Sequence, residues 1–446
     1  MFGDGVATNP VRRRCSSWAA ALLLWLLPAV GWAMAPIQHW QTANGARVYF
    51  VPAPELPMVD VRVVFDAGSA RDNGHPGLAH LTNALLDQGA GELTADQIAD
   101  RLAGLGAQLS TGAMRDMAWV SLRSLSAADR LNPAADLVAK VLTQPTFKKA
   151  AFDREQQRLI VAARQREQQP AAVAEQAFYR DLYGNQPYGS PPGGTVDSLQ
   201  GLNSEDARGF YLRYYVAHNA TVAIVGALDS KQAHALAERL VGKLPAGEAP
   251  DPLPKVSDLS RGKTQRVDFP ASQTTIMMGA PGISRTDPDY FPLYVGNYVL
   301  GGGGLVSRLN EQIREKRGLS YSVYSYFAPM ARRGPFVLGL QTRNDKASEA
   351  LGLMKKVLDR YVKNGPTAKE VEAAKKNITG GFPLRVDTNA KIVEYLAMIG
   401  YYHLPLDYLK TFNRKVQAVT RKQIHAAFER RVHPDRMVTV VVGGGQ

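Results

Sequence analysis

Three residues near the C-terminus, His425, Glu429 and His433, carry metal-binding side chains at intervals of four. Residues four apart lie on one face of an α-helix, so this spacing could bring all three to one metal ion. His433, however, directly precedes Pro434, and the position before a proline disfavours the helical conformation. We therefore expect the helix to end before His433 and assign no metal site here.

A second candidate is the segment His80-Leu-Thr-Asn83-Ala84. Its spacing matches the zinc motif His-x-x-Glu-His, in which two histidines on one helical face hold Zn²⁺ and the glutamate activates water. Here Asn83 stands at the glutamate position, and an amide oxygen is too weakly basic to accept a proton from water. Ala84 has no ligand atom, and one imidazole does not hold zinc. We predict that His80 is a hydrogen-bonded structural residue.

Four further segments indicate a family relationship. They read FDAGSARD at 65–72, PYGSPPGGT at 187–195, NSEDARGFYLRYYVAHNATVAIVG at 203–226 and GLVSRLNEQIREKRGLSYSV at 304–323. With the segment around His80, they resemble the pitrilysin/insulin-degrading-enzyme family of zinc metallopeptidases, the inverted zincins. The resemblance is to the short-chain branch typified by the mitochondrial processing peptidase, and it covers essentially the whole mature chain.

The resemblance adds one position to the zinc site. In the family a third ligand, a glutamate, comes from a later helix, which corresponds here to REQQRLIVAARQ at 154–165. The glutamate position falls on Ala162. His80, Asn83, Ala84 and Ala162 are therefore the positions of a degenerate zinc site, and we predict no metal and no cofactor in this chain.

A second pair of site residues is also implied by the resemblance. In active relatives an arginine, followed seven positions later by a tyrosine, binds the substrate backbone and helps to stabilise the oxyanion; Arg314 and Tyr321 have this spacing. Gly318 is expected to turn the helix into a strand between them, and Arg317 is an alternative to Arg314. Without the resemblance, a solvated helix end with basic residues would explain this segment as well.

The glycine run Gly301–Gly304 is not a phosphate loop, because no Lys-Ser/Thr follows it. We interpret it as a flexible turn that begins a helix. A loop lining a peptide chamber is the alternative.

The sequence contains an internal repeat of one structural unit. The strand-like runs ATVAIVG at 220–226 and MVTVVVG at 437–443 place Gly226 and Gly443 217 residues apart. The same offset of 217 residues separates the strand-like segment WVSLRSL at 119–125 from FVLGLQT at 336–342. Strands followed by helices within each copy favour an α+β architecture.

The family resemblance implies two similar tandem domains, each a mixed or antiparallel sheet covered by helices, facing each other as a half-clam. We place the N-terminal metallopeptidase-like domain at 37–244 and the C-terminal one at 264–446. Between them, residues 245–263 are rich in proline, aspartate and serine and are predicted to be a linker.

The N-terminus is typical of a secretory signal peptide. Arg12–Arg14 precede a short apolar run at 18–30, and cleavage after Ala33 satisfies the need for small residues, so 1–33 is the predicted signal. Cleavage after Ala35 and an uncleaved anchor are the alternatives. The single cysteine, Cys15, would leave with the signal, and no other stretch is apolar enough to span a membrane.

The net charge of +13 would fall to +11 in the mature chain. Its basic residues are scattered, without a basic tail or an aromatic-interleaved stripe, and this excludes nucleic acid as the expected partner. We expect a periplasmic protein.

The family resemblance therefore implies an inactive subunit, a pseudoenzyme, that completes a heteromeric zinc metalloendopeptidase. A homologous partner chain would carry the zinc, in a heterodimer or larger assembly acting on peptides, and Arg314 and Tyr321 would complement its site. The alternative is a catalytically silent scaffold or peptide-binding protein, like the core subunits of respiratory complexes. An active peptidase with a rebuilt metal site is a third interpretation.

Overall fold

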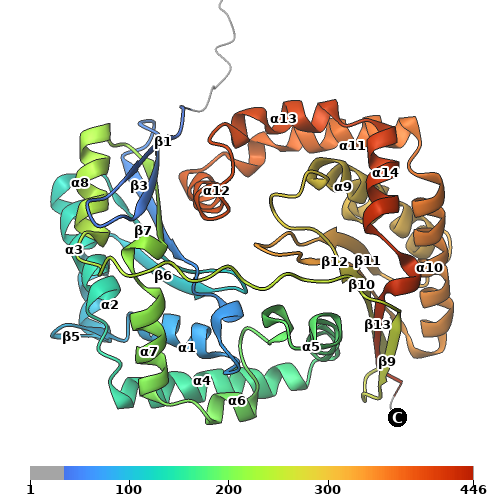
Figure 1. Cartoon of the computed structure of the whole chain (residues 1–446), viewed down its shortest axis with the longest axis horizontal. Helices are drawn as coiled ribbons and strands as arrows, with labels where there is room; N and C mark the ends of the chain where they lie inside the picture. Colours follow the sequence, from blue (N-terminus) through green and yellow to red (C-terminus); the bar gives the residue numbers. More distant parts are fainter. Residues whose placement is uncertain (1–34, 445–446) are drawn as a thin grey trace, which may run out of the picture. The chain divides into compact units, whose positions relative to one another are not determined.

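A computed structural model describes residues 35–444, so the predicted signal peptide lies outside the described residues. In this range two large β-sheets are covered by helices (Figure 1). The first sheet has the strand order β1 (Gln38–Gln41), β2 (Arg47–Pro52), β8 (Ala220–Gly226), β3 (Met58–Phe65), β7 (Ala118–Leu125) and β6 (Gln108–Ala113). Strands β4 (Gly89–Ala90) and β5 (Leu93–Thr94) form a separate small hairpin.

The second sheet repeats the first. Its order is β11 (Ser322–Phe327), β12 (Pro335–Arg343), β10 (Gln273–Pro281), β13 (Val438–Val442) and β9 (Lys263–Val267). Each sheet has one parallel pair, β2–β8 in the first and β9–β13 in the second, and the other pairings are antiparallel. β12 begins at Pro335, 217 residues after β7 begins at Ala118. The predicted repeat and the α+β class are confirmed.

The helices of the first copy are α1 (Leu78–Leu85), α2 (Ala95–Gly104), α3 (Ala128–Thr143), α4 (Lys149–Glu167), α5 (Pro170–Tyr183), α6 (Val196–Gln200), α7 (Ser204–Tyr214) and α8 (Ser230–Val241). Those of the second copy are α9 (Tyr290–Asn297), α10 (Ala347–Asn364), α11 (Ala368–Gly381), α12 (Asn389–Tyr401), α13 (Tyr408–Ala418) and α14 (Arg421–Arg431). A capping box formed by Thr94 and Gln97 begins α2.

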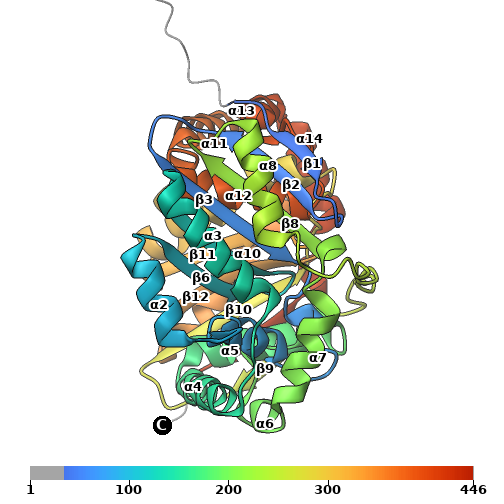
Figure 2. The ribbon, with the colours of Figure 1, turned by 90° about the vertical axis from the view of Figure 1, so that its left-hand side faces the viewer.

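The two copies exchange one helix each. α5, from the first copy, packs on β10 and β13 of the second sheet, where Phe178 joins a core with Met277 and Val440. α12, from the second copy, packs on β8 and β3 of the first sheet. In Figure 2, α3 and α8 cover the face of the first sheet turned to the viewer, with α12 behind it. Each sheet therefore completes its core with a helix from the other half of the sequence.

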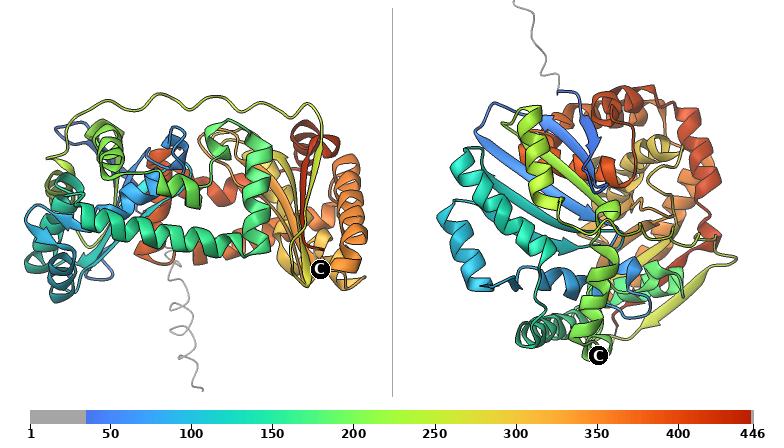
Figure 3. Two further views of the ribbon diagram at one scale, coloured as in Figure 1. Left: turned by 90° about the horizontal axis from the view of Figure 1, so that it is seen from below. Right: turned by 60° about the vertical axis from the view of Figure 1, so that its left-hand side comes forward.

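Residues 245–262 contain no helix or strand and form the long extended segment in Figure 3. The segment is fixed along its length: Arg71 donates to the carbonyl of Asp251, and Arg332 donates to that of Leu253. Contacts group the described residues from 35 onward into one unit, so the domain boundaries at 244 and 264 stay predictions. Among residues 35–444, no helix is both long and apolar enough to cross a membrane.

Candidate functional site

The helix that carries the degenerate motif, α1, is anchored at its N-terminus by a buried carboxylate. Asp72 accepts hydrogen bonds from the backbone N–H groups of Gly77 and Ala79, at 2.9 and 2.8 Å. Gly77 has φ +95°, a conformation that favours glycine, so the chain can turn sharply into the helix. Burial raises the pKa of Asp72 to about 8, against the lowering effect of the two amide bonds.

Asn83 has a structural position in this helix. Its side chain is 1% exposed, and its amide donates to the carbonyl of Trp119 and to the hydroxyl of Tyr215, both at 3.2 Å. These bonds connect α1 to β7 and to the residue that follows α7. The side chain at the predicted general-base position thus joins three parts of the core.

His80 lies beside two guanidinium groups of α4. Burial, and then the charges of Arg158 and Arg166, lower the pKa of its imidazole. Arg158 pairs with Glu155 at 2.7 Å, and Arg166 donates to the carbonyl of Gly193 at 2.9 Å. No hydrogen bond to the His80 ring occurs within the described part of the chain, so the hydrogen-bonded role predicted for it is not found there.

These residues do not fit a zinc ion. Ala84 and Ala162 place methyl groups at the second-histidine and glutamate positions, and both are partly exposed on their helices. Neutral imidazole and carboxylate ligands bind Zn²⁺, whereas neighbouring guanidinium groups repel it. Over residues 35–444, no cluster of three or more His, Cys, Asp or Glu side chains is arranged to hold a metal.

The metal-binding side chains near the C-terminus, His425, Glu429 and His433, do not share one helical face. α14 ends at Arg431, and His433 lies beyond it in an extended conformation. His425 and Glu429 remain close, at 3.4 Å, and the His425 ring also contacts the carbonyl of Lys363. The prediction that the helix ends before His433 is confirmed.

Arg314 and Tyr321 are brought together. Arg314 lies in the π-helical turn η7 (Asn310–Glu315), and Gly318, with φ +60°, reverses the chain towards β11. The Arg314 guanidinium carbon is 4.6 Å from the centroid of the Tyr321 ring, which is a cation–π contact. Arg317 instead donates to the carbonyl of Gln312 within its own turn.

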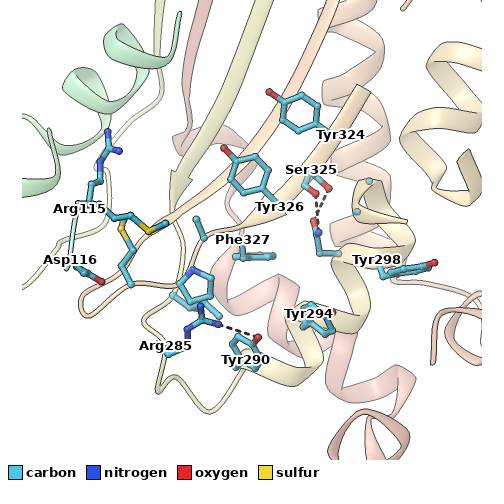
Figure 4. A pocket seen from close by; sticks show the side chains of 18 of the residues that line it. Arg115, Asp116, Arg285, Tyr290, Tyr294, Tyr298, Tyr324, Ser325, Tyr326 and Phe327 are labelled. Atoms are coloured by element: carbon cyan, nitrogen blue, oxygen red, sulfur yellow. Dashed lines mark hydrogen bonds between the residues drawn. The ribbon is translucent and has the colours of Figure 1, made fainter. Parts of the chain in front are cut away.

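A cavity of about 820 Å³ lies beside the second sheet, and none of the predicted catalytic or zinc-site residues lines it (Figure 4). Its wall is rich in tyrosine: Tyr290, Tyr294, Tyr298, Tyr324, Tyr326 and Tyr402. Arg115, Arg285 and Arg385 also line it. Gly301, Gly302 and Gly304 also line it, which agrees with the alternative prediction that this glycine run lines a chamber. The tyrosines and arginines were not predicted, although the spacing of Tyr290, Tyr294 and Tyr298 by four residues was a sign of one aromatic helical face.

One carboxylate, Asp116, lines the cavity, and its oxygens are already bonded. It accepts from the hydroxyls of Tyr188 and Tyr402, at 2.5 and 2.8 Å, and from the backbone N–H of Ala331 at 2.7 Å. Burial raises the pKa of this carboxyl group. Asp116 follows β6, whereas Tyr402 and Ala331 belong to the second copy, so this residue links the two copies at the cavity wall.

Comparison with known proteins gives the family. Residues 47–196 match the family described as Insulinase (Peptidase family M16), and residues 201–378 match the one described as Peptidase M16 inactive domain. A crystal structure described as a peptidase M16 inactive domain from Pseudomonas fluorescens is 40% identical, covers 91% of this chain and 97% of its own, and superposes with a TM-score of 0.88. The chain belongs to peptidase family M16. The resemblance to the insulin-degrading-enzyme family is thereby confirmed.

Two further M16 comparisons are informative. A Helicobacter pylori protein named non-peptidase homolog YmxG is 28% identical over 83% of this chain and 85% of its own length. The periplasmic protease PqqL of Escherichia coli shares the fold, with a TM-score of 0.76 at 18% identity, over 92% of this chain but 46% of that chain. These comparisons support an inactive homologue within family M16.

Proposed function

We propose that this M16 chain is the non-catalytic subunit of an exported zinc endopeptidase, in which a homologous partner chain supplies the zinc. The replacement of the ligand and base positions by Asn83, Ala84 and Ala162 supports the first half of the proposal. With two arginines beside His80, the first copy of the repeat has lost both the ligands and the electrostatic environment for Zn²⁺.

The stacked pair Arg314–Tyr321 is the observation that supports the second part of the proposal, that this chain completes a peptidase whose zinc comes from a partner chain. Tyr321 is 82% exposed, and within residues 35–444 no carboxylate forms an ion pair with Arg314. A guanidinium and a phenol held together at the surface offer N–H and O–H donors to another molecule. Donors of this kind stabilise an oxyanion that develops during peptide hydrolysis. Because this chain has no group that activates water at the family's position, the donors need a second chain that has one.

The length of a relative supports pairing. The alignment with PqqL covers nearly all of this chain but less than half of PqqL, so PqqL has room for a second unit of the same size in one polypeptide. We infer that here the second unit is a separate, zinc-bearing M16 chain. The 37–244 and 264–446 domains, joined by 245–263, would together form this chain's share of the assembly.

Export rests on the N-terminal sequence. The run Arg12–Arg14 followed by the apolar residues 18–30 supports a signal peptide ending at Ala33, and hence a periplasmic subunit. N-terminal sequencing of the protein recovered from a periplasmic extract tests this directly. A first residue of Met34 is expected, and retention of residues 1–33 in the mature protein would contradict export with cleavage.

Reconstitution tests the whole proposal. The mature chain and a zinc-bearing M16 homologue from the same host are purified separately, and peptide cleavage is measured for each and for the mixture. The account expects cleavage to rise strongly on mixing, together with a stable complex on size-exclusion chromatography. If the zinc-bearing homologue is equally active without this chain, the proposed complementation is wrong.

A catalytically silent scaffold or peptide-binding protein is the second candidate. The tyrosine-lined cavity favours it, because the cavity persists without any of the predicted catalytic residues. Affinity purification of the chain from its native host, followed by mass spectrometry, separates the candidates. A zinc-bearing M16 chain recovered in equal amount supports the peptidase, and recovery of a membrane or scaffold assembly without one supports the alternative.

A further inference from the structure

The arginines of the tyrosine-lined cavity have no acidic partners. Among the described residues, Arg115, Arg285 and Arg385 form no salt bridge, in contrast to arginines such as Arg71, Arg308 and Arg431 elsewhere in the fold. The one carboxylate in the wall, Asp116, is occupied by two tyrosine hydroxyls and a backbone amide. The cavity therefore has an uncompensated positive charge.

Each of these guanidinium groups is held by aromatic side chains and keeps free donors. Arg285 lies over the rings of Tyr290 and Tyr402, at 5.6 and 5.5 Å, and its Nε is buried without a hydrogen-bond partner. Arg385 donates to the hydroxyl of Tyr294 at 2.5 Å. A buried donor without a partner carries a desolvation penalty, which an anionic ligand would remove.

Arg115 completes this arrangement from the opposite wall. Its guanidinium carbon lies 3.5 Å from the ring centroid of Tyr179 on α5. In Figure 4, Arg115 lies on the side of Asp116, whereas Arg285 lies beside Tyr290 of α9 and donates to its hydroxyl at 3.3 Å. Guanidinium groups fixed over aromatic rings are oriented before binding, which favours planar, bidentate recognition of a carboxylate.

The remaining wall is long and aromatic. Five consecutive residues of the edge strand β11, Val323 to Phe327, line the cavity. At about 3.3 Å per residue, this wall extends roughly 16 Å. Tyr324 and Tyr326 stack 5.9 Å apart on one face of the strand, and both rings are exposed. A wall of this length and composition matches several residues of an extended peptide better than a small anion.

We propose that this cavity binds a peptide segment that combines carboxylate groups with aromatic or apolar side chains, with Arg285 and Arg385 pairing with the carboxylates and Tyr324 and Tyr326 packing against the apolar groups. The inference deepens the proposed function by naming the substrate class of the subunit, and it rests on that function for its biological role. The carboxylate can come from an aspartate or glutamate side chain or from a peptide C-terminus.

The test uses the mature chain alone and fluorescence anisotropy with labelled synthetic peptides. The first peptide has glutamates flanking a phenylalanine and an amidated C-terminus. The second replaces each glutamate with glutamine, and the third is the second with a free C-terminal carboxylate. Because charge-assisted hydrogen bonds are roughly twice as strong as neutral ones, at least one carboxylate peptide should bind about tenfold or more tighter than the second. The first and third peptides show which carboxylate source is used.

Variants locate the site. Arg385→Gln and Arg285→Gln should each reduce binding of the preferred peptide about tenfold, whereas Arg360→Gln, an equal loss of charge on the exposed face of α10, should leave it unchanged. If Arg285→Gln unfolds the chain, the Arg385→Gln variant, at an exposed position, and the comparison of the three peptides on the wild-type chain still test the proposal. Equal binding of all three peptides, or equal effects of Arg385→Gln and Arg360→Gln, would overturn the proposal.

These outcomes are independent of the proposed peptidase. The measurement needs neither zinc nor a partner chain, so selective binding of acidic peptides can stand even if reconstitution yields no cleavage. Conversely, a reconstituted complex that cleaves peptides without preference for carboxylates, and is unaffected by Arg385→Gln, would support the peptidase and refute the charge-selective cavity.

Discussion

The side-chain amide of Asn83 donates to the hydroxyl of Tyr215 across 3.2 Å, at the helix position where an active M16 enzyme would carry its general base. The same amide donates to the carbonyl of Trp119. Tyr215 is fully buried, and burial raises the pKa of its phenol. The residue at the predicted general-base position is therefore part of the core.

Removing this amide should destabilise the chain. Asn83→Ala leaves the Tyr215 hydroxyl and the Trp119 carbonyl with one partner fewer in a buried setting, so we expect a loss of about 1–3 kcal/mol in the free energy of unfolding. Urea denaturation measures it. Asn377→Ala, on the exposed face of α11, is the matched control and should change stability by about 0.5 kcal/mol or less. Equal effects of the two substitutions would show that the amide is not structural.

Rebuilding part of the motif should not rebuild the metal site. Asn83→Glu with Ala84→His restores the pattern His-x-x-Glu-His, but Ala162 still lacks a carboxylate and Arg158 still lies beside His80. With two protein ligands and adjacent positive charge, tight zinc binding is not expected. Isothermal titration with ZnCl₂ is the measurement. Stoichiometric, tight binding by the double variant would contradict this account of the site.

The Arg314–Tyr321 pair should matter for turnover and not for assembly. In the reconstituted complex, Arg314→Ala and Tyr321→Phe should each lower kcat on the order of 10²-fold, since each removes one oxyanion donor. Arg317→Ala, whose side chain bonds within its own turn, should have a much smaller effect. Complex formation is followed by size-exclusion chromatography. Wild-type rates in both variants would remove the pair from the mechanism, and a large loss in Arg317→Ala alone would transfer the role to that residue.

A partly buried ion pair at the start of α11 should make the stability of the chain depend on pH in the acidic range. The Glu370 carboxylate accepts hydrogen bonds from the Arg308 guanidinium at 2.6 and 2.7 Å and from Thr367. Burial raises the pKa of Glu370, but these hydrogen bonds outweigh burial and lower it to about 2. A carboxyl pKa that is lower in the folded state contributes stability above the unfolded value and loses it as the pH falls towards the folded value. Glu370→Gln should therefore cost about 1 kcal/mol at neutral pH, with the difference from wild type vanishing between about pH 4.5 and pH 2. A constant difference across this window would contradict the assignment.

The exchanged helix α12 approaches the first sheet closely at one glycine. A Cβ on Gly400 would lie 2.5 Å from atoms of both Thr221 and Tyr49. Gly400→Ala should therefore displace α12 and destabilise the chain, by about 1–3 kcal/mol as for other overpacked sites. Gly380→Ala in α11 meets no atom within 4 Å and should be neutral or stabilising. Thermal unfolding compares the two, and similar melting temperatures would show that α12 does not depend on this contact.

The repeat was predictable because similar segments recur at one common spacing, and the degenerate motif because it is local in sequence. Gly226 and Gly443 end strands that are equivalent in the two sheets, and their spacing alone revealed the duplication. The motif at His80 is contained within one short helix, so the loss of its chemistry could be seen without a structure. The pair Arg314 and Tyr321 was implied only by the family resemblance, and the structure brings the two side chains into contact.

The helix exchange and the cavity were not predictable, because both depend on which surfaces meet. An amphipathic pattern shows that α5 and α12 bury one face, but it does not identify the sheet that receives it. Arg115, Arg285 and Arg385 come from segments far apart in sequence, and the absence of ion pairs to them is a property of the folded chain. The short edge strand β1 was missed because four residues carry too little periodicity.

The zinc content of the mature chain purified alone tests the central claim most directly. After dialysis against excess zinc and removal of loosely bound ion, metal analysis should find no stoichiometric zinc, and the same sample should leave peptide substrates intact. One zinc per chain, retained together with peptide cleavage that a chelator abolishes, would contradict the account of this M16 chain as an inactive subunit.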